Sequence, residues 1–258
     1  MKITFIGTIG SALTADQTYS SILINEDLLL DCGEGTTQKL IRLGVVDTIN
    51  TICFTHLHND HFLGVFSLLW YYWINSNRIK QLNLIGPPEL GSSLKTILDL
   101  IHTPSDAFKF KFNYIFLQDT SKIQNISIND YIIQYTKVEH YPLSFAYRIL
   151  DQKTNKSVCY TGDLRPSDSI IQLSKDCDSL ICESTFPDEL KDFADKYFHC
   201  TPSTAAELAR NSGAKKLFLN HISSVFYNKY GPLYFEKQAE NKYKNKVIIA
   251  QDLMAFEI

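Results

Sequence analysis

Apolar runs of strand length alternate with segments of helical spacing along the whole chain. In the first half, the pattern predicts strands over residues 2–7, 20–24, 28–32, 51–55 and 82–85, and helices over 36–43, 62–75 and 90–102. In the second half, it predicts strands over 114–117, 127–137, 144–150, 157–160, 179–183, 216–220 and 247–249, and a helix over 201–212. The run at 28–32 is continuously apolar, so we expect a strand that is buried on both faces.

This order of elements predicts an α/β protein. Helices and strands alternate in both halves with antiparallel runs between them, which fits a four-layer αββα sandwich of two mixed β-sheets covered by helices on both outer faces. The pattern alone does not separate this sandwich from other α/β layer folds. The chain has 258 residues, 45% of them hydrophobic, and shows no repeat, linker-like segment or charge block. We therefore expect a single domain over residues 1–258.

Charge and cysteine content narrow the class of protein. The formal net charge is −3, which does not indicate a nucleic-acid partner, although five lysines gather between residues 229 and 246. No apolar run has the length of a membrane span or the form of a secretory signal, so we expect no membrane partner. The six cysteines are scattered and form no Cys-x-x-Cys pair. This pattern is typical of reduced, partly buried thiols in a cytoplasmic protein.

Three histidines and an aspartate fall within six residues at the end of a predicted strand: His56, His58, Asp60 and His61. A single histidine is usually a hydrogen-bonded core side chain or a surface residue. Four ionisable groups in one strand-to-helix turn would be costly to desolvate without a partner, and a metal ion supplies that partner. Because side chains alternate along an extended segment, His56 and His58 leave on the same face, whereas Asp60 and His61 follow after the turn and can face a second ion. Imidazole and carboxylate ligands suit zinc.

The segment Thr55-His56-Leu57-His58-Asn59-Asp60-His61 resembles the signature of the metallo-β-lactamase superfamily. Further segments resemble its ribonuclease Z branch and occur in that branch's order: Phe5-Ile-Gly-Thr8, Asp31-Cys-Gly-Glu-Gly-Thr36, Thr161-Gly-Asp163 and Asn220-His221-Ile-Ser-Ser224. The resemblance extends from the first predicted strand to His221. It implies the metallo-β-lactamase fold and a metal-dependent hydrolase.

The resemblance also implies a full set of metal ligands. One ion would be held by His56, His58 and His140, the other by Asp60, His61 and His221, and Asp163 would bridge both. Two zinc ions, with manganese as the alternative, would share a hydroxide that attacks the substrate, and Asp60 counts among the catalytic residues as well as among the ligands. We expect Asp31 and Glu34 to orient ligand histidines or to brace their turn, and His102 to lie at a helix end.

A second pair of residues bears on the reaction. Ile181-Cys-Glu183-Ser-Thr185 and His199-Cys-Thr201 resemble the glutamate and histidine that assist phosphodiester cleavage in the ribonuclease Z branch. An alkoxide leaving group needs a proton, and His199, oriented and kept cationic by Glu183, would supply it as the general acid. The alternative is structural, with Glu183 ending a strand and His199 preceding a helix that begins near Pro202.

Two departures from the branch bear on the substrate. Long-form ribonuclease Z enzymes carry an arm that grips transfer RNA between the third ligand histidine and the bridging aspartate, but residues 140–163 hold only two predicted strands and a polar turn. After His221 the branch usually has an arginine and a tyrosine, whereas this chain reads Ser223-Ser-Val-Phe-Tyr227. Small armless phosphodiesterases of the branch open cyclic nucleotides or related diesters, often as homodimers.

The leading hypothesis is therefore a dinuclear metal-dependent phosphodiesterase of a small nucleotide diester, such as a cyclic nucleotide, that forms a homodimer. The main alternative is a transfer RNA 3′-processing endoribonuclease with RNA as its partner. A lactone, thioester or lactam hydrolase would not need Glu183 and His199, and a non-catalytic binding protein would be expected to have lost a ligand. The roles of two segments are undecided. Residues 66–73 form a buried helix, a dimer face or a base-stacking surface. Residues 226–246 form a lid or a surface connection.

Overall fold

The computed structural model describes residues 1–258 and contains two seven-stranded sheets and one two-stranded sheet. The first sheet holds, in spatial order, β16 (Ala255–Glu257), β1 (Lys2–Gly7), β3 (Ser21–Ile24), β4 (Leu28–Leu30), β5 (Thr51–Cys53), β6 (Leu82–Gly86) and β7 (Phe112–Phe116). The second holds β15 (Lys246–Ile249), β13 (Lys216–Asn220), β12 (Ser179–Glu183), β11 (Lys156–Tyr160), β10 (Ser144–Asp151), β9 (Tyr131–Val138) and β8 (Gln124–Ile128). The small sheet pairs β2 (Ile9–Gly10) with β14 (Ile222–Ser223).

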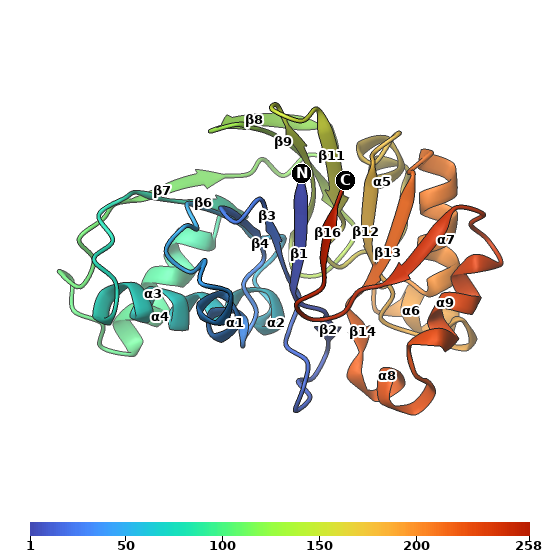
Figure 1. Cartoon of the computed structure of the whole chain (residues 1–258), viewed down its shortest axis with the longest axis horizontal. Coiled ribbons are helices and arrows are strands. Elements are labelled where there is room, and N and C mark those ends of the chain that lie inside the picture. The colour runs from blue at the N-terminus through green and yellow to red at the C-terminus, as the bar shows by residue number, and fades with distance from the viewer.

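Both large sheets are mixed. Strands β4 to β7 run parallel in the first sheet, as do β11, β12, β13 and β15 in the second, whereas β1, β3 and β4 and β8 to β11 pair antiparallel. The two ends of the chain lie side by side, because β16 pairs with β1 and sets Glu257 opposite Lys2 (Figure 1).

Helices cover the outer faces of both large sheets (Figure 1). The helices of the chain are α1 (Thr36–Leu43), α2 (Asn59–Phe62), α3 (Gly64–Ile74), α4 (Leu90–Leu100), α5 (Asp168–Leu173), α6 (Lys191–Lys196), α7 (Pro202–Ser212), α8 (Ser224–Tyr230) and α9 (Pro232–Glu240), with a 3-10 turn at Asp188–Leu190. None of these helices combines the length and the apolar character that a membrane crossing requires.

Three hydrophobic clusters separate four layers. One lies between the two sheets and includes Phe5, Tyr147 and Phe218. The second packs α1, α3 and α4 on the first sheet, and the third packs α5, α7 and α9 on the second. Strand β4 lies between two layers, since Leu28 and Leu30 belong to the central cluster and Leu29 to an outer one. The predicted αββα sandwich of two mixed sheets is confirmed, and so is the strand buried on both faces.

Element boundaries differ from the prediction where turn residues interrupt an apolar run. The single strand expected over 127–137 is wrong, because β8 ends at Ile128 and β9 begins at Tyr131. Asn129 has a φ of 50° there, in the left-handed region that asparagine tolerates in tight turns.

The two segments whose roles the sequence leaves undecided, residues 66–73 and 226–246, both contribute to the layered core. Helix α3 buries Val65, Leu68, Leu69 and Tyr72, which favours the buried-helix alternative for residues 66–73. Its opposite side leaves Trp70 38% exposed. In the segment 226–246, Phe235 and Ala239 are fully buried in the outer cluster of the second sheet, so α9 is a packed helix and not a lid.

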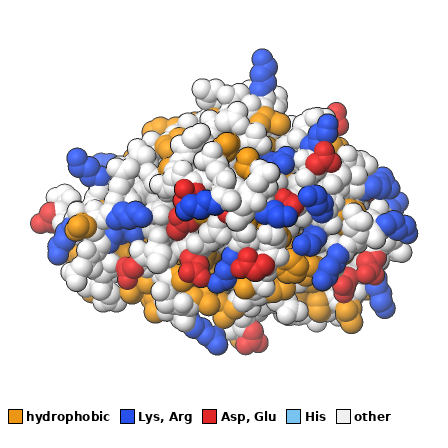
Figure 2. Space-filling view, turned by 45° about the horizontal axis from the view of Figure 1, so that its top comes forward, with side chains coloured by type: hydrophobic (Ala, Val, Ile, Leu, Met, Phe, Trp, Pro, Cys, Tyr) orange, Lys and Arg blue, Asp and Glu red, His pale blue; other side chains and the backbone are white.

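Charges of both signs mix on the face shown in Figure 2. Lysine and arginine side chains alternate there with aspartate and glutamate, and no continuous basic area forms on that face. This distribution gives no footprint for a nucleic-acid backbone on that side of the molecule.

Backbone contact between two glycines fixes the turn that carries the histidine cluster. The Cys32 N–H donates to the His61 carbonyl at 2.8 Å. A Cβ on Gly64 would stand 1.9 Å from the Gly33 carbonyl oxygen, and a Cβ on Gly33 would stand 2.3 Å from the Asp60 carbonyl oxygen. The two segments therefore approach more closely than any residue with a side chain permits.

We expect Gly64→Ala to lower the free energy of unfolding by about 1–3 kcal/mol, because the added methyl group would collide with backbone that cannot rotate away. Gly91→Ala is the matched control, since Gly91 is also helical and its added Cβ would meet only the rings of Phe116 and Tyr114, at 3.2 Å or more. Urea unfolding of both variants measures the difference. An equal loss in the two variants would contradict the close-approach explanation.

Candidate metal centre

The first four candidate ligands come from one segment beyond β5. The chain leaves the strand with a bend at Thr55, and His58 is extended, with φ −64° and ψ 154°. It then turns into α2, which carries Asp60 and His61. The histidine rings of the two pairs still lie close together, with the His56 ring centre 4.7 Å from that of His58 and 4.2 Å from that of His61.

The remaining three candidate ligands come from the second sheet. His140 lies two residues beyond β9, Asp163 three residues beyond β11, and His221 directly beyond β13. His221 has a φ of 54° and its N–H donates to the Thr8 carbonyl at 2.9 Å. The site therefore lies where the ends of strands from both sheets meet.

The seven side chains form two groups that share a carboxylate. Ligand atoms of His56, His58, His140 and Asp163 lie within 4.8 Å of one another, and so do those of Asp60, His61 and His221. Asp163 Oδ1 lies 3.3 Å from His61 Nε2 and 3.4 Å from His221 Nε2. Its Oδ2 lies 3.9 Å from His140 Nε2 and 4.0 Å from His56 Nε2. One oxygen of Asp163 thus faces each group.

The donor atoms fit a pair of divalent cations. His140 Nε2 and Asp163 Oδ1 are buried and have no hydrogen-bond partner. The Nε2 atoms of His61 and His221 are 3.2 Å apart, and at most one nitrogen of such a pair can carry the shared proton. Lone pairs that converge without donors are costly in a buried site, and cations would satisfy them. Imidazole and carboxylate donors suit zinc and also manganese.

Each candidate ligand histidine except His58 has a partner outside the ligand set at one of its ring nitrogens. The partners are the Thr55 hydroxyl for His56 (2.9 Å), Asp31 Oδ2 for His61 (2.7 Å), the Phe198 carbonyl for His140 (3.1 Å) and the Thr185 hydroxyl for His221 (3.0 Å). Such contacts fix the tautomer and aim the other nitrogen at the ion.

Asp31 and Glu34 have different environments, although both come from the glycine turn. Asp31 is fully buried and accepts hydrogen bonds from the Thr55 N–H (2.7 Å) and the Tyr160 hydroxyl (2.8 Å) as well as contacting His61. Glu34 is exposed. The structure thus gives Asp31 an orienting contact and Glu34 none. His102 is exposed and lies just beyond α4.

Burial and neighbouring charges shift the pKa values of the candidate ligands in different directions. Burial lowers the pKa of His56, His58 and His140, which favours neutral rings. Burial alone would raise the pKa of Asp163, but His221 and His61 outweigh it and hold that pKa well below its usual value. The pKa of His61 is raised despite burial, because Asp163 and Asp31 favour positive charge at this point. A bound cation would supply the same charge.

Glu183, which is buried, and His199, which is partly exposed, form a separate pair beside the two groups. Glu183 Oε1 lies 2.8 Å from His199 Nδ1 and also accepts from the Leu164 N–H, while Oε2 accepts from the Thr185 N–H and hydroxyl. Burial would lower the pKa of His199, but the adjacent Glu183 carboxylate outweighs burial and raises it to about 9. His199 also lies near Asp163 and His221, so these three make a third possible ligand group.

Several residues that complete the site were not singled out from the sequence. Thr185 contacts Glu183, His199 and His221 through one hydroxyl. Tyr160 and the Phe198 carbonyl are the others. Thr185 stands inside the quoted Glu183-Ser-Thr185 segment, which was the available signal. A backbone carbonyl such as that of Phe198 leaves no signal in the sequence.

Comparison with known proteins identifies the family. The family model described as anti-Pycsar protein Apyc1 matches residues 1–222. The ribonuclease Z of Picrophilus torridus is 30% identical, with 87% of this chain and 86% of that protein aligned, and the ribonuclease Z of Archaeoglobus fulgidus is 27% identical, with 100% and 97% aligned.

Solved structures agree on the fold. The metallo-beta-lactamase fold protein YhfI from Bacillus subtilis superposes with a TM-score of 0.83 at 24% identity and covers 100% of this chain and 99% of its own. Human tRNase Z, short form (ELAC1), superposes with a TM-score of 0.82 at 24% identity and the same coverage. The predicted metallo-β-lactamase fold of the short ribonuclease Z type is confirmed. The chain belongs to the Apyc1 anti-Pycsar family, and it is a metal-dependent hydrolase of the phosphodiesterase class.

Proposed function

We propose that the protein hydrolyses cyclic nucleotides to nucleoside monophosphates with two zinc ions. The observation that carries this proposal is the pairing of Glu183 with His199 beside the two groups of candidate ligands. A cyclic phosphodiester expels a ribose alkoxide that needs a proton, whereas a thioester expels a thiolate that can leave without one. Membership of the Apyc1 family supports a cyclic nucleotide as the diester.

The ligand assignment is also our proposal. His56, His58 and His140 hold one ion, Asp60, His61 and His221 hold the other, and Asp163 bridges them. Ions bound there would lower the pKa of a water molecule and polarise the phosphoryl oxygens. Asp60 is ionised, since His61 and His221 lower its pKa despite its burial, and it contributes negative charge to the group that holds His61 and His221.

His199 acts on the leaving group in this scheme. Its Nδ1 contacts Glu183 at 2.8 Å, and the ring is 16% exposed, which leaves Nε2 free to meet a substrate. As the oxygen of water bonds to phosphorus, the bond between phosphorus and the ribose oxygen breaks. His199 Nε2 gives its proton to that oxygen, and Glu183 stabilises the ring while it is cationic.

The transfer RNA 3′-processing activity remains the second candidate, because ribonuclease Z relatives align over most of the chain. Between His140 and Asp163 the chain forms only β10 and β11, an antiparallel pair joined by a short turn, so no arm for transfer RNA is inserted there. This favours the small diester.

Three further expectations stay predictions. A single domain over residues 1–258 is supported by the continuous central cluster between the sheets. A cytoplasmic location is supported by six free, buried cysteines. A homodimer is supported by the outer side of α3, where Leu63 and Ile74 are 42% and 62% exposed and Trp70 lies between them.

The substrate proposal is tested by incubating the zinc-loaded and manganese-loaded protein with a panel of cyclic nucleotides and with a transfer RNA precursor that bears a 3′ trailer. We expect the cyclic nucleotides to be opened and the precursor to stay intact. Cleavage of the precursor alone would make the protein an armless ribonuclease Z and would refute the small-diester proposal.

The acid role of His199 is tested with two leaving groups. We expect His199→Ala to lower kcat on a cyclic nucleotide by at least about tenfold, because the ribose alkoxide then leaves without a proton. On bis(p-nitrophenyl) phosphate the loss should be much smaller, since nitrophenolate needs no proton. His102→Ala, which changes an exposed histidine away from the site, is the control. Equal losses on both substrates would exclude general-acid catalysis by His199.

The bridging role of Asp163 is tested by metal content. We expect the wild-type protein to bind two zinc ions per chain and Asp163→Asn to lose at least one of them after gel filtration, because a neutral amide bridges two cations poorly. Elemental analysis gives the stoichiometry. Circular dichroism checks in parallel that the variant keeps its fold without zinc. A variant that retains both ions would show that Asp163 is not the bridge.

A further inference from the structure

Arg165 lies two residues beyond Asp163 and joins the segments that carry His140 and Asp163. Its N–H donates to the Glu139 carbonyl at 2.8 Å, which forms an isolated antiparallel bridge between residues 139 and 165. Its guanidinium Nη1 also donates to Glu139 Oε1 at 2.9 Å. Glu139 directly precedes His140, so main chain and side chain of Arg165 both hold the His140 segment.

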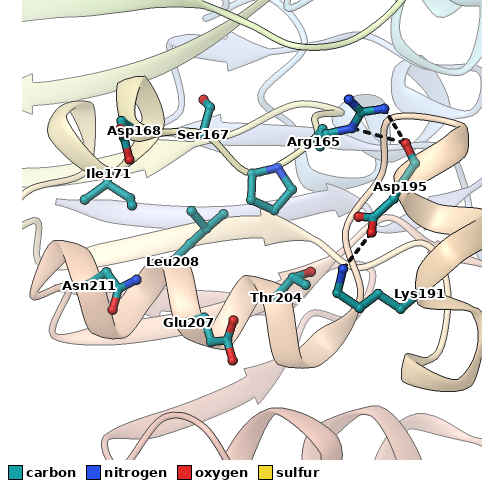
Figure 3. Close-up of a pocket in the computed structure, with 11 residues that line it drawn as sticks. Arg165, Ser167, Asp168, Ile171, Lys191, Asp195, Thr204, Glu207, Leu208 and Asn211 are labelled. Carbon is teal, nitrogen blue, oxygen red and sulfur yellow. Dashed lines mark hydrogen bonds and ion pairs between the residues drawn. The ribbon is translucent and has the colours of Figure 1, made fainter.

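The same side chain reaches α6. Nε donates to the Asp195 carbonyl at 3.1 Å, and Nη2 donates to the same oxygen (Figure 3). Asp195 is in the last turn of α6, where carbonyl groups lack helical partners and a cation is favoured. Arg165 therefore caps the C-terminal end of α6, the short helix that precedes Phe198 and His199.

The plane of the guanidinium lies over the Phe198 ring, with its carbon 4.4 Å from the ring centre. Phe198 has a φ of 59°, which is unfavourable for a residue with a side chain. This conformation turns the Phe198 carbonyl toward His140 Nδ1 at 3.1 Å, while the next residue, His199, contacts Glu183. The backbone of residues 198–199 therefore serves a candidate ligand and the candidate acid together.

We propose that Arg165 is a positioning residue that holds the Phe198–His199 segment, and through it aims both the His140 ring and the His199 ring. This inference deepens the function proposed above and rests on it for the role of His199. Arg165 contacts neither group directly. It binds the helix end before the segment, the aromatic ring within it and the strand end that bears His140.

An ordinary surface ion pair does not account for this arrangement. The Arg165 and Glu139 side chains are 34% and 51% exposed, so their ion pair by itself contributes little to stability. The contacts with the Asp195 carbonyl and the Phe198 ring need the planar, many-donor guanidinium, which lysine lacks. Arg165 and Lys191 both line a groove of about 520 Å³ between α5, α6 and α7, but Lys191 pairs with the Asp195 carboxylate, through Oδ2, and not with its carbonyl (Figure 3).

The test compares Arg165→Met with Arg148→Met. Methionine keeps the apolar stem of the arginine and removes every donor. Arg148 is the matched control, because it also donates to backbone carbonyls, those of Leu173 and Lys175, but contacts no residue of the site. For each protein, three quantities are measured: the thermal midpoint, the zinc affinity by competition with a chromogenic chelator, and kcat on a cyclic nucleotide and on bis(p-nitrophenyl) phosphate.

We expect both variants to lower the thermal midpoint, and Arg165→Met alone to weaken zinc binding by about tenfold, because His140 loses its fixed orientation. We also expect Arg165→Met to lower kcat on the cyclic nucleotide more than kcat on bis(p-nitrophenyl) phosphate, because the second reaction depends less on His199. Arg165→Lys should recover only part of both losses, since it cannot donate to Asp195 and cover Phe198 together.

Three results separate the outcomes. If Arg165→Met behaves like Arg148→Met in zinc affinity and in the ratio of the two substrates, Arg165 is only a structural residue and the proposal is overturned. If zinc binding weakens but both substrates slow equally, the part of the proposal that concerns His199 is wrong. If wild type opens no cyclic nucleotide, the proposed function fails, and the zinc competition still decides whether Arg165 positions His140.

Discussion

The carboxylate of Asp163 is the group on which the arrangement of the site depends. It comes from the second sheet, yet its two oxygens face histidines on the segment that follows β5 of the first. A buried carboxylate surrounded by imidazoles is costly to desolvate, and the nearby positive charge that offsets this cost must come from protonated histidines or from bound cations. Because the sandwich brings the strand ends of both sheets to one edge, the same packing that buries the core also creates this polar cluster. The fold and the candidate metal centre are therefore consequences of one geometry.

Much of the fold and of the candidate site could be predicted from the sequence, for physical reasons. Strand and helix positions follow from apolar spacing, so the sandwich was predictable, whereas the turn at Asn129 was missed because the apolar residues on either side of it keep the strand pattern. The histidine cluster was predictable because four ionisable groups in one turn need a partner. The later candidate ligands His140, Asp163 and His221 needed a resemblance, since a single polar residue after a strand carries no specific signal. The structure brings all seven together.

The residues that support the candidate ligands act through geometry that sequence spacing does not encode. Asp31 and Glu34 are three residues apart and chemically alike, but only Asp31 is enclosed by Thr55, Tyr160 and His61. Thr185 serves three side chains from separate elements with one hydroxyl. Arg165 acts on the backbone of other segments, and backbone carbonyls are the same for every residue type. Contacts of this kind become visible only when the chain has folded.

The site contains two pairs of a carboxylate and a histidine, Asp31 with His61 and Glu183 with His199. The two pairs differ in the surroundings of the second ring nitrogen of the histidine. Asp31 contacts His61 Nδ1 at 2.7 Å, and Glu183 contacts His199 Nδ1 at 2.8 Å. His61 is fully buried, and its Nε2 lies among Asp163 and His221, so it suits an ion that would exclude a proton from that nitrogen. His199 is partly exposed, and its nearest approach to Asp163 is 4.0 Å, through the nitrogen that Glu183 already engages. Its other nitrogen is free to hold a proton and to meet a substrate. The same local chemistry thus fits a candidate ligand inside the cluster, at His61, and the proposed acid at its rim, at His199.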